Sequence, residues 1–127
     1  MTQIFYTNYK IESRDSLLQK AKSRDATVVD CRHVPYSQFY SLWNKEVLQN
    51  LFKENYIHVK EFVNQNFGTH KEFNIVDIKM GIEIIEELLK SKSVILLCAC
   101  AEFDKCHLKE IVKELEIHFD EVEISEL

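Results

Sequence analysis

Strand-like and helix-like segments alternate along the 127-residue chain, and this alternation predicts an α/β fold made of a single domain, residues 1–127. Two of the strand-like segments, 27–31 (TVVDC) and 93–100 (SVILLCAC), are almost wholly apolar. Such runs are typical of strands that are buried on both faces of a parallel sheet. Parallel strands are joined by right-handed crossovers, so helices are expected on both sides of the sheet. The sequence therefore predicts a three-layer sandwich around a mostly parallel sheet of about five strands.

Each element is predicted from its own pattern. Strands are expected where β-branched and aromatic residues cluster, at residues 3–9, 27–31, 56–62, 93–100 and 121–125. Helices are expected where apolar residues recur at helical spacing, at residues 13–24, 44–55, 76–92 and 106–119. Ser13 or Asp15 is suited to cap the first helix. Asp104 is suited to cap the last helix, which would place Cys106 and His107 in its first turn.

Composition narrows the class of protein. Hydrophobic residues make up 46% of the chain and charged residues 29%, which are ordinary values for a globular protein. The longest apolar stretch, 94–101, is too short to span a bilayer, and the start of the chain does not have the pattern of a signal peptide. We therefore expect a cytoplasmic protein without a membrane partner, in which the four cysteines are reduced thiols.

Charge argues against one kind of ligand site, and glycine content excludes another. The formal net charge of −5 argues against a surface for non-specific nucleic-acid binding, which needs many Lys and Arg side chains. The chain has only two glycines, so a glycine-rich phosphate loop is excluded. An anion would have to be bound by side chains or by a helix N-terminus.

Polar residues that are capable of chemistry gather where the predicted strands end. Tyr6, Thr7 and Asn8 end the first strand, Asp30 and Arg32 end the second, and Glu61 ends the third. Residues 98–107 follow the fourth. Because α/β sheets bind ligands at the carboxyl ends of their strands, this distribution predicts one site at that edge.

The segment 98–107 carries the main candidates for catalysis. Cys98 or Cys106 is the predicted nucleophile, His107 the proton carrier and Asp30 the orienting carboxylate. A helix N-terminus would stabilise a thiolate at Cys106. The alternative is that the cysteines are packing residues of a buried strand.

Zinc is a rival ligand for the same segment. Cys98, Cys100, Cys106 and His107 are four soft donors within ten residues. Zinc sites normally use Cys-x2–4-Cys pairs, however, and this chain has Cys-x-Cys. We therefore assign no metal and no cofactor in the leading interpretation, and keep a zinc-binding protein as an alternative. A phosphatase-type Cys-x5-Arg loop is excluded, because Asp104 stands six residues after Cys98.

The rest of the predicted site would hold a small molecule, and we expect a nucleotide-like or other polar planar ligand. The residues expected to contact it are Arg32, Tyr6, Asn8, Ser37, Trp43, Cys100 and Glu102. Arg32 would pair with Asp30 or with an anionic ligand; a structural ion pair with Asp30 is the alternative.

Aromatic residues just beyond the second strand admit two interpretations. Tyr36, Phe39, Tyr40 and Trp43 would form a lid that stacks on the ligand, or a helix-packing or homodimer surface. Whether the protein is an enzyme stays open at this point. Non-catalytic ligand sensing and protein interaction are the alternatives.

Motifs along nearly the whole chain resemble one family. The segments YTNY, VVDCRHVPYSQFYSLWNKEVL, YIHVKEF and LLCACAEFDKCH are similar in order and spacing to the bacterial and phage domain of unknown function 488. The positions that match its pattern are Asp30, Arg32, Pro35, Ser37, Trp43, Asn44, His58, Cys98, Cys106 and His107. The resemblance implies a Rossmann-like α/β domain and does not supply a reaction.

Three positions depart from the family pattern. Gln38 and Leu108 stand where arginines are frequent, and Asn8 replaces a glycine. The loss of two cations makes a strongly anionic ligand less expected, or shifts its binding to Arg32 and Lys45.

Overall fold

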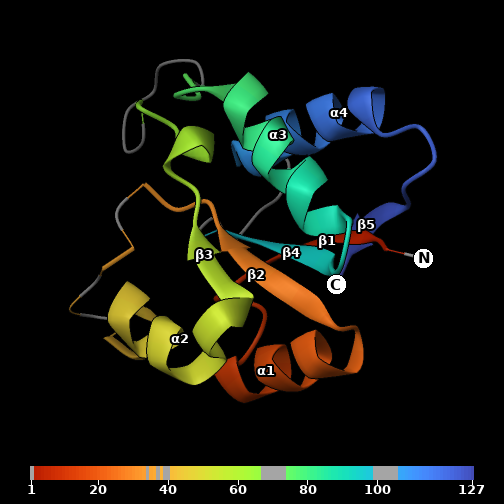
Figure 1. Ribbon diagram of the computed structural model, residues 1–127. Coiled ribbons are helices and arrows are strands. Elements are labelled where there is room, and N and C mark those ends of the chain that lie inside the picture. The colour runs from red at the N-terminus through yellow and green to blue at the C-terminus, as the bar shows by residue number, and fades with distance from the viewer. Residues whose placement is uncertain (1, 34, 37, 39–40, 67–73, 99–105) are drawn as a thin grey trace.

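The computed structural model contains one sheet of five parallel strands in the spatial order β3-β2-β4-β1-β5 (Figure 1). It describes residues 2–33, 35–36, 38, 41–66, 74–98 and 106–127. The strands are β1 (Ile4–Asn8), β2 (Ala26–Asp30), β3 (Tyr56–His58), β4 (Ser93–Cys98) and β5 (Ile124–Glu126). The helices are α1 (Arg14–Ser23), α2 (Lys45–Phe52), α3 (Ile78–Leu89) and α4 (Leu108–His118), and three short 3-10 helices are η1 (Ser41–Trp43), η2 (Lys53–Asn55) and η3 (Lys60–Phe62).

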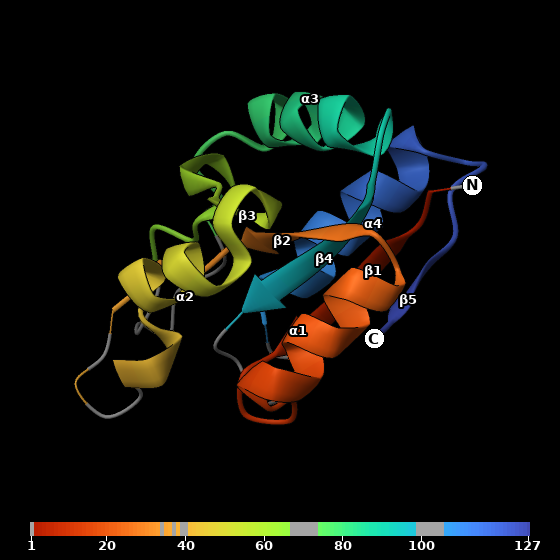
Figure 2. The same ribbon diagram turned by 60° about the horizontal axis from the view of Figure 1, so that its bottom comes forward.

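Helices cover both faces of the sheet. α1 and α2 lie on one face, while α3 and α4 lie on the other, and the rotated view shows the same division (Figures 1 and 2). The chain runs from β1 to β3 with its helices on the first face, then returns through β4 to β5 with its helices on the second. The α/β, Rossmann-like three-layer sandwich predicted from the alternating segments is thus confirmed.

The sheet separates two apolar clusters, and the residues of β4 alternate between them. Val94, Leu96 and Cys98 belong to the cluster under α3 and α4. Ile95 and Leu97 belong to the cluster under α1 and α2. This alternation is the two-residue period of a strand that is buried on both sides. It decides on which face each functional side chain lies.

Single residues fix the start of α1 and the packing of α3. The Oγ of Ser13 accepts a hydrogen bond from the backbone N–H of Ser16 at 3.1 Å, so Ser13 and not Asp15 caps α1. Gly81 lets α3 approach η3 closely. A Cβ at this position would lie 2.3 Å from Cε1 of Phe62, whose side chain is fully buried.

Two predicted elements are shorter than expected. The third strand ends at His58, and Lys60–Phe62 forms η3 instead, so Glu61 lies in a helical turn and not at a strand end. Phe62 enters the core from this turn and is fully buried there. The last helix begins at Leu108, with His107 as its N-cap residue, so Cys106 and His107 precede its first turn. Asp104, the predicted cap, lies outside the described residues.

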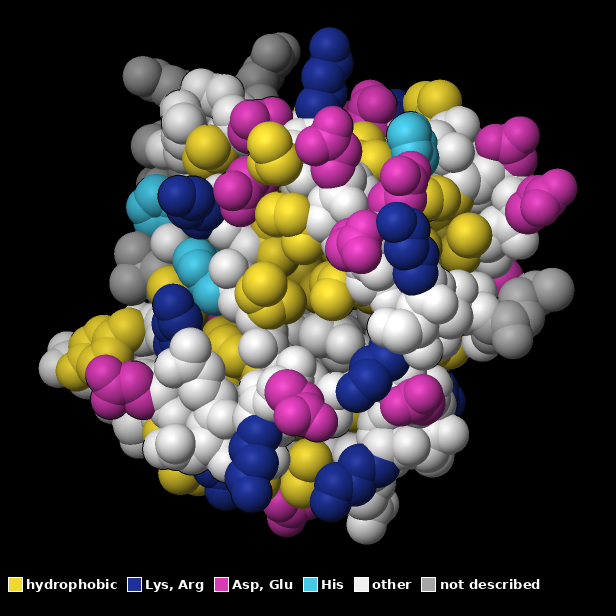
Figure 3. All heavy atoms as spheres, in the orientation of Figure 1, with side chains coloured by type: hydrophobic (Ala, Val, Ile, Leu, Met, Phe, Trp, Pro, Cys, Tyr) yellow, Lys and Arg dark blue, Asp and Glu magenta, His cyan; other side chains and the backbone are white. Residues whose placement is uncertain are grey.

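The surface seen in Figure 3 mixes both signs of charge, because acidic and basic side chains are interspersed with hydrophobic ones on its described part. Among the residues that the structure describes, no helix is both long and apolar enough to cross a bilayer. The prediction about non-specific nucleic-acid binding concerns the whole surface and stays a prediction.

Candidate functional site

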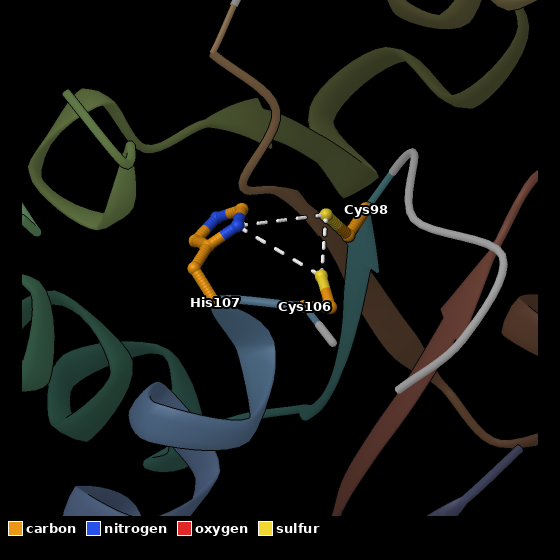
Figure 4. A group of neighbouring side chains, drawn as sticks. All are labelled: Cys98, Cys106 and His107. Atoms are coloured by element: carbon orange, nitrogen blue, oxygen red, sulfur yellow. Dashed lines mark hydrogen bonds between the residues drawn. The ribbon is translucent and has the colours of Figure 1, made fainter. Parts of the chain in front are cut away.

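Two cysteines and a histidine meet at the carboxyl end of β4 (Figure 4). Cys98 is the last residue of β4, and His107 and the preceding Cys106 lead into α4. The Sγ atoms of Cys98 and Cys106 are 3.1 Å apart. Nδ1 of His107 lies 3.8 Å from each sulfur. All three side chains are buried, with 2% of each exposed.

A backbone carbonyl fixes the orientation of the His107 ring. Its Nε2 lies 2.9 Å from the carbonyl oxygen of Cys31. A carbonyl oxygen can only accept a hydrogen bond, so Nε2 must carry the proton and donate it. Nδ1 is the atom that faces both sulfurs, and in the neutral ring it is the nitrogen with the lone pair.

This arrangement offers three soft donor atoms in one place. Sγ of Cys98, Sγ of Cys106 and one ring nitrogen of His107 all lie within 4.8 Å of one another. Thiolate sulfur and imidazole nitrogen are the preferred ligands of Zn²⁺ and related metals. The Cys98/Cys106/His107 cluster could therefore hold a metal ion.

Asp30 is the centre of a second polar cluster, at the end of β2. Its carboxylate is fully buried and pairs with Arg32, whose Nη2 donates to Oδ2 at 2.7 Å and whose Nε donates to Oδ1 at 2.9 Å. The hydroxyl of Tyr56 donates to the same Oδ2. Arg32 also donates to the backbone carbonyl of Trp43 at 2.6 Å. The predicted pairing of Arg32 with Asp30 is therefore present.

The electrostatics of this second cluster follow from its burial. Desolvation alone would lower the pKa of Arg32, but the hydrogen bonds and the charge of Asp30 outweigh it, and the pKa is raised. Burial raises the pKa of the Tyr56 hydroxyl as well, and the nearby Asp30 carboxylate adds to the effect. Both groups therefore keep their protons, and Arg32 carries its positive charge beside Asp30.

Asp30 does not face the cysteines, contrary to the expectation of one shared pocket. In the β2–β4 register Asp30 lies beside Leu97, one residue before Cys98. Leu97 points to the face covered by α1 and α2, where Tyr56 and Trp43 also pack. Cys98 points to the face covered by α3 and α4. The two polar clusters thus share the carboxyl edge of the sheet but lie on opposite faces, because neighbouring residues of a strand alternate.

The backbone that follows β2 lies between the two clusters. Cys31 donates its N–H to the carbonyl of Leu97 at 2.8 Å and accepts from His107. The next carbonyl, that of Arg32, accepts from Nε2 of His58 at 2.8 Å. Cys31 itself packs in the apolar core, where burial raises the pKa of its thiol.

The remaining predicted ligand-binding residues are spread over the same edge. Tyr6 and Asn8 lie within the last three residues of β1, and the Asn8 side chain accepts from the N–H groups of Lys10 and Ile11. Trp43 is 8% exposed and packs against Tyr9, with ring centroids 5.7 Å apart.

Several predicted residues cannot be placed. Ser37, Phe39, Tyr40, Cys100 and Glu102 lie outside the described residues. Tyr36, in contrast, is described and is 67% exposed.

Tyr56 is a partner of Asp30 that the sequence pattern does not reveal. The signal was its place at the start of the third strand, but only the β2–β3 pairing brings its hydroxyl to Asp30.

Comparison of the chain with protein-family models, with curated proteins and with solved structures found no match.

Proposed function

We propose that this chain binds a thiophilic divalent metal ion, of which Zn²⁺ is the natural candidate, through Cys98, Cys106 and His107. The observation that carries the proposal is the direction of the His107 ring. Nε2 is committed to the carbonyl of Cys31, while Nδ1 faces both sulfurs. A histidine that ligates a metal typically donates its other N–H to a carbonyl or carboxylate in this way.

The distances fit a tetrahedral site after a small adjustment. Zn–S bonds of about 2.3 Å and Zn–N bonds of about 2.05 Å imply separations of roughly 3.8 Å between two sulfurs and roughly 3.5 Å between sulfur and nitrogen. The observed separations are 3.1 Å and 3.8 Å. The sulfurs would therefore move apart by about 0.7 Å and the ring would approach them by about 0.3 Å on binding.

Three protein donors would leave one position of a tetrahedral ion for another ligand. Catalytic zinc sites keep such a position for water or substrate, whereas structural sites fill it with a fourth side chain. The intervening sequence includes Cys100, which lies outside the described residues. A variant at Cys100 therefore separates these two kinds of site.

Cobalt titration tests the proposal directly. Reduced, metal-free protein is titrated with Co²⁺, whose visible and near-ultraviolet bands report tetrahedral geometry and thiolate ligation, and Zn²⁺ is then added as a competitor. We expect one equivalent of Co²⁺ to bind and Zn²⁺ to displace it. Replacing Cys98 or Cys106 with Ser should weaken binding by at least about 100-fold, since loss of an outer-shell partner alone costs about 10–100-fold.

Cys31→Ala is the matched control, because it removes another buried cysteine of the same face but keeps the carbonyl that holds His107. It should bind Co²⁺ like the wild-type protein. Equal affinity in Cys98→Ser, Cys106→Ser and Cys31→Ala would contradict the proposal. If Cys100→Ser also loses the cobalt spectrum, the site has four protein ligands and is of the closed kind.

A polar, planar small molecule is a second candidate ligand, and one surface feature favours it. A hollow of about 450 Å³ lies where β1 leads into α1, and its lining includes the aromatic Tyr9 and Trp43, the basic Lys10 and Arg14, and the acidic Glu12 and Asp15. Aromatic rings suit stacking on a planar ligand, and the balanced charges suit a polar ligand rather than a strongly anionic one. A thermal-shift panel of nucleotides tests this, because a ligand that binds only the folded state raises its melting temperature.

Three further predictions stay proposals of the same kind. They are membership of the family of domain of unknown function 488, a cytoplasmic location and formation of a homodimer.

A further inference from the structure

The two sulfurs of the cluster are closer together than a metal ion would hold them. Their separation of 3.1 Å is about 0.7 Å shorter than the spacing around tetrahedral zinc, and about 1 Å longer than a disulfide bond. We infer that Cys98 and Cys106 form a redox-active pair, which a small hydroperoxide converts reversibly into a disulfide.

The positions of the two residues in the fold favour this pairing over others. Cys98 ends β4 and Cys106 precedes α4, and both side chains lie in the apolar cluster under α3 and α4. Their sulfurs already point toward each other (Figure 4). Cys31 lies in the same cluster and near Cys98, but its thiol is directed to the carbonyl of Val29, which lies 3.6 Å from its Sγ.

Burial selects the class of oxidant. Cys98 and Cys106 are each 2% exposed, so a bulky disulfide such as oxidised glutathione cannot align three sulfurs at this place without opening the fold. Hydrogen peroxide is hardly larger than water and needs only a narrow path. The pair is therefore expected to react with hydroperoxides faster than with glutathione disulfide.

The reaction balances in two steps. One cysteine sulfur attacks an oxygen of hydrogen peroxide, the O–O bond breaks, and a sulfenic acid and one water are formed. The second sulfur attacks the sulfenic sulfur, the S–O bond breaks, and a second water leaves as the disulfide forms. Two thiols lose two electrons and two protons in total, and the peroxide is reduced to two waters. A dithiol reductant reverses the change.

Oxidation and metal binding exclude each other at this site, because a disulfide removes two of the three proposed metal ligands. The inference does not require the metal, however, and it is tested on metal-free protein. A chain that forms the disulfide but binds no Co²⁺ would overturn only the proposed function. A chain that binds Co²⁺ but forms no disulfide would overturn only this inference.

Peptide mapping can identify the linked residues. Reduced, metal-free protein is treated with stoichiometric hydrogen peroxide and then unfolded and alkylated. Its intact mass is measured by mass spectrometry both before and after alkylation. Of the four cysteines, we expect two to become inaccessible to the alkylating reagent, and the mass before alkylation to fall by two hydrogens. Trypsin cuts after Lys92, Lys105 and Lys109, so the disulfide would join peptides 93–105 and 106–109.

Variants decide which sulfurs take part. Peptide 93–105 contains both Cys98 and Cys100. In Cys100→Ser the cross-link should persist, with three alkylatable cysteines falling to one. In Cys106→Ser no cross-link should form, and all three should remain. Should that variant not fold, Cys100→Ser and Cys31→Ala still decide the question, since both should keep the cross-link.

Three outcomes would overturn the inference. They are a cross-link that involves Cys31 or depends on Cys100, oxidation of single cysteines to sulfinic acid without a cross-link, and retention of all four alkylatable thiols. Treatment with oxidised glutathione at the same concentration is the comparison for the class of oxidant. Equal or faster cross-linking by glutathione would show that burial does not select the hydroperoxide.

Discussion

Replacing Asp30 with Asn should destabilise the protein strongly. The carboxylate is fully buried and is the partner of an Arg32 side chain that is only 5% exposed. Asn keeps the shape and one acceptor oxygen, but it leaves the guanidinium charge without compensation in the interior. Breaking one partner of a buried ion pair costs about 3–5 kcal/mol in free energy of unfolding. The loss is a large share of the roughly 5–15 kcal/mol that stabilises a typical domain.

Urea unfolding measures this loss, with the fluorescence of the single tryptophan, Trp43, as the probe. Trp43 is suitable because it is buried and its carbonyl accepts from Arg32. With a denaturant slope of about 2 kcal/mol per molar, the midpoint of Asp30→Asn should fall by roughly 1.5–2.5 M. Glu87→Gln, which breaks the exposed pair with Lys90, is the control and should leave the midpoint unchanged.

A hydrophobic replacement of the whole pair separates charge burial from a general loss of packing. The double variant Asp30→Leu with Arg32→Met leaves no unpaired charge, so it should be more stable than Asp30→Asn. The reasoning would be refuted if Asp30→Asn unfolded within about 1 kcal/mol of the wild-type protein, or if the double variant were the least stable of the set.

Three further changes test other contacts. The raised pKa of Tyr56 keeps its proton bound in the folded state, while the unfolded chain releases this proton near pH 10. The free energy of unfolding should therefore fall above that pH by up to about 1.4 kcal/mol per pH unit, and urea titrations should show a shallower fall in Tyr56→Phe. Gly81→Ala should lower the melting temperature, although alanine favours helices by about 1 kcal/mol, because the added Cβ meets the buried ring of Phe62 at a cost of about 1–3 kcal/mol; a higher melting temperature would contradict this. Asn8→Ala removes the acceptor of two backbone N–H groups and should cost about 1 kcal/mol, with faster hydrogen exchange at those amides as the measurement.

The arrangement of layers could be predicted because it depends on local patterns. The apolar run at 94–97 has no polar face, which favours a strand covered on both sides. The apolar stripe of α3 indicates a helix that packs one face against the core. The third strand was overestimated, because the apolar residues after His58 include Phe62, which enters the core from a helical turn.

The grouping of the site residues was predictable only within one segment. Cys98, Cys106 and His107 come together because a strand end and the following helix are joined by a short connection. Asp30 depends on the register between β2 and β4, which distant packing sets. A shift of one residue in this register would change the face on which it lies, and nothing in the local sequence specifies that shift.

The hydrogen bond from His107 to the carbonyl of Cys31 joins two sites that lie on opposite faces of the sheet. Asp30 precedes that peptide group and Arg32 follows it, so a ring that rotates to meet a ligand pulls on the backbone between the two charged partners. We expect that a ligand bound to the Cys98/Cys106/His107 cluster changes the rigidity of the backbone at the Asp30–Arg32 pair. The two sites would then be coupled through the backbone carbonyl of Cys31. For this coupling the position of the carbonyl oxygen matters more than the identity of the side chain at residue 31.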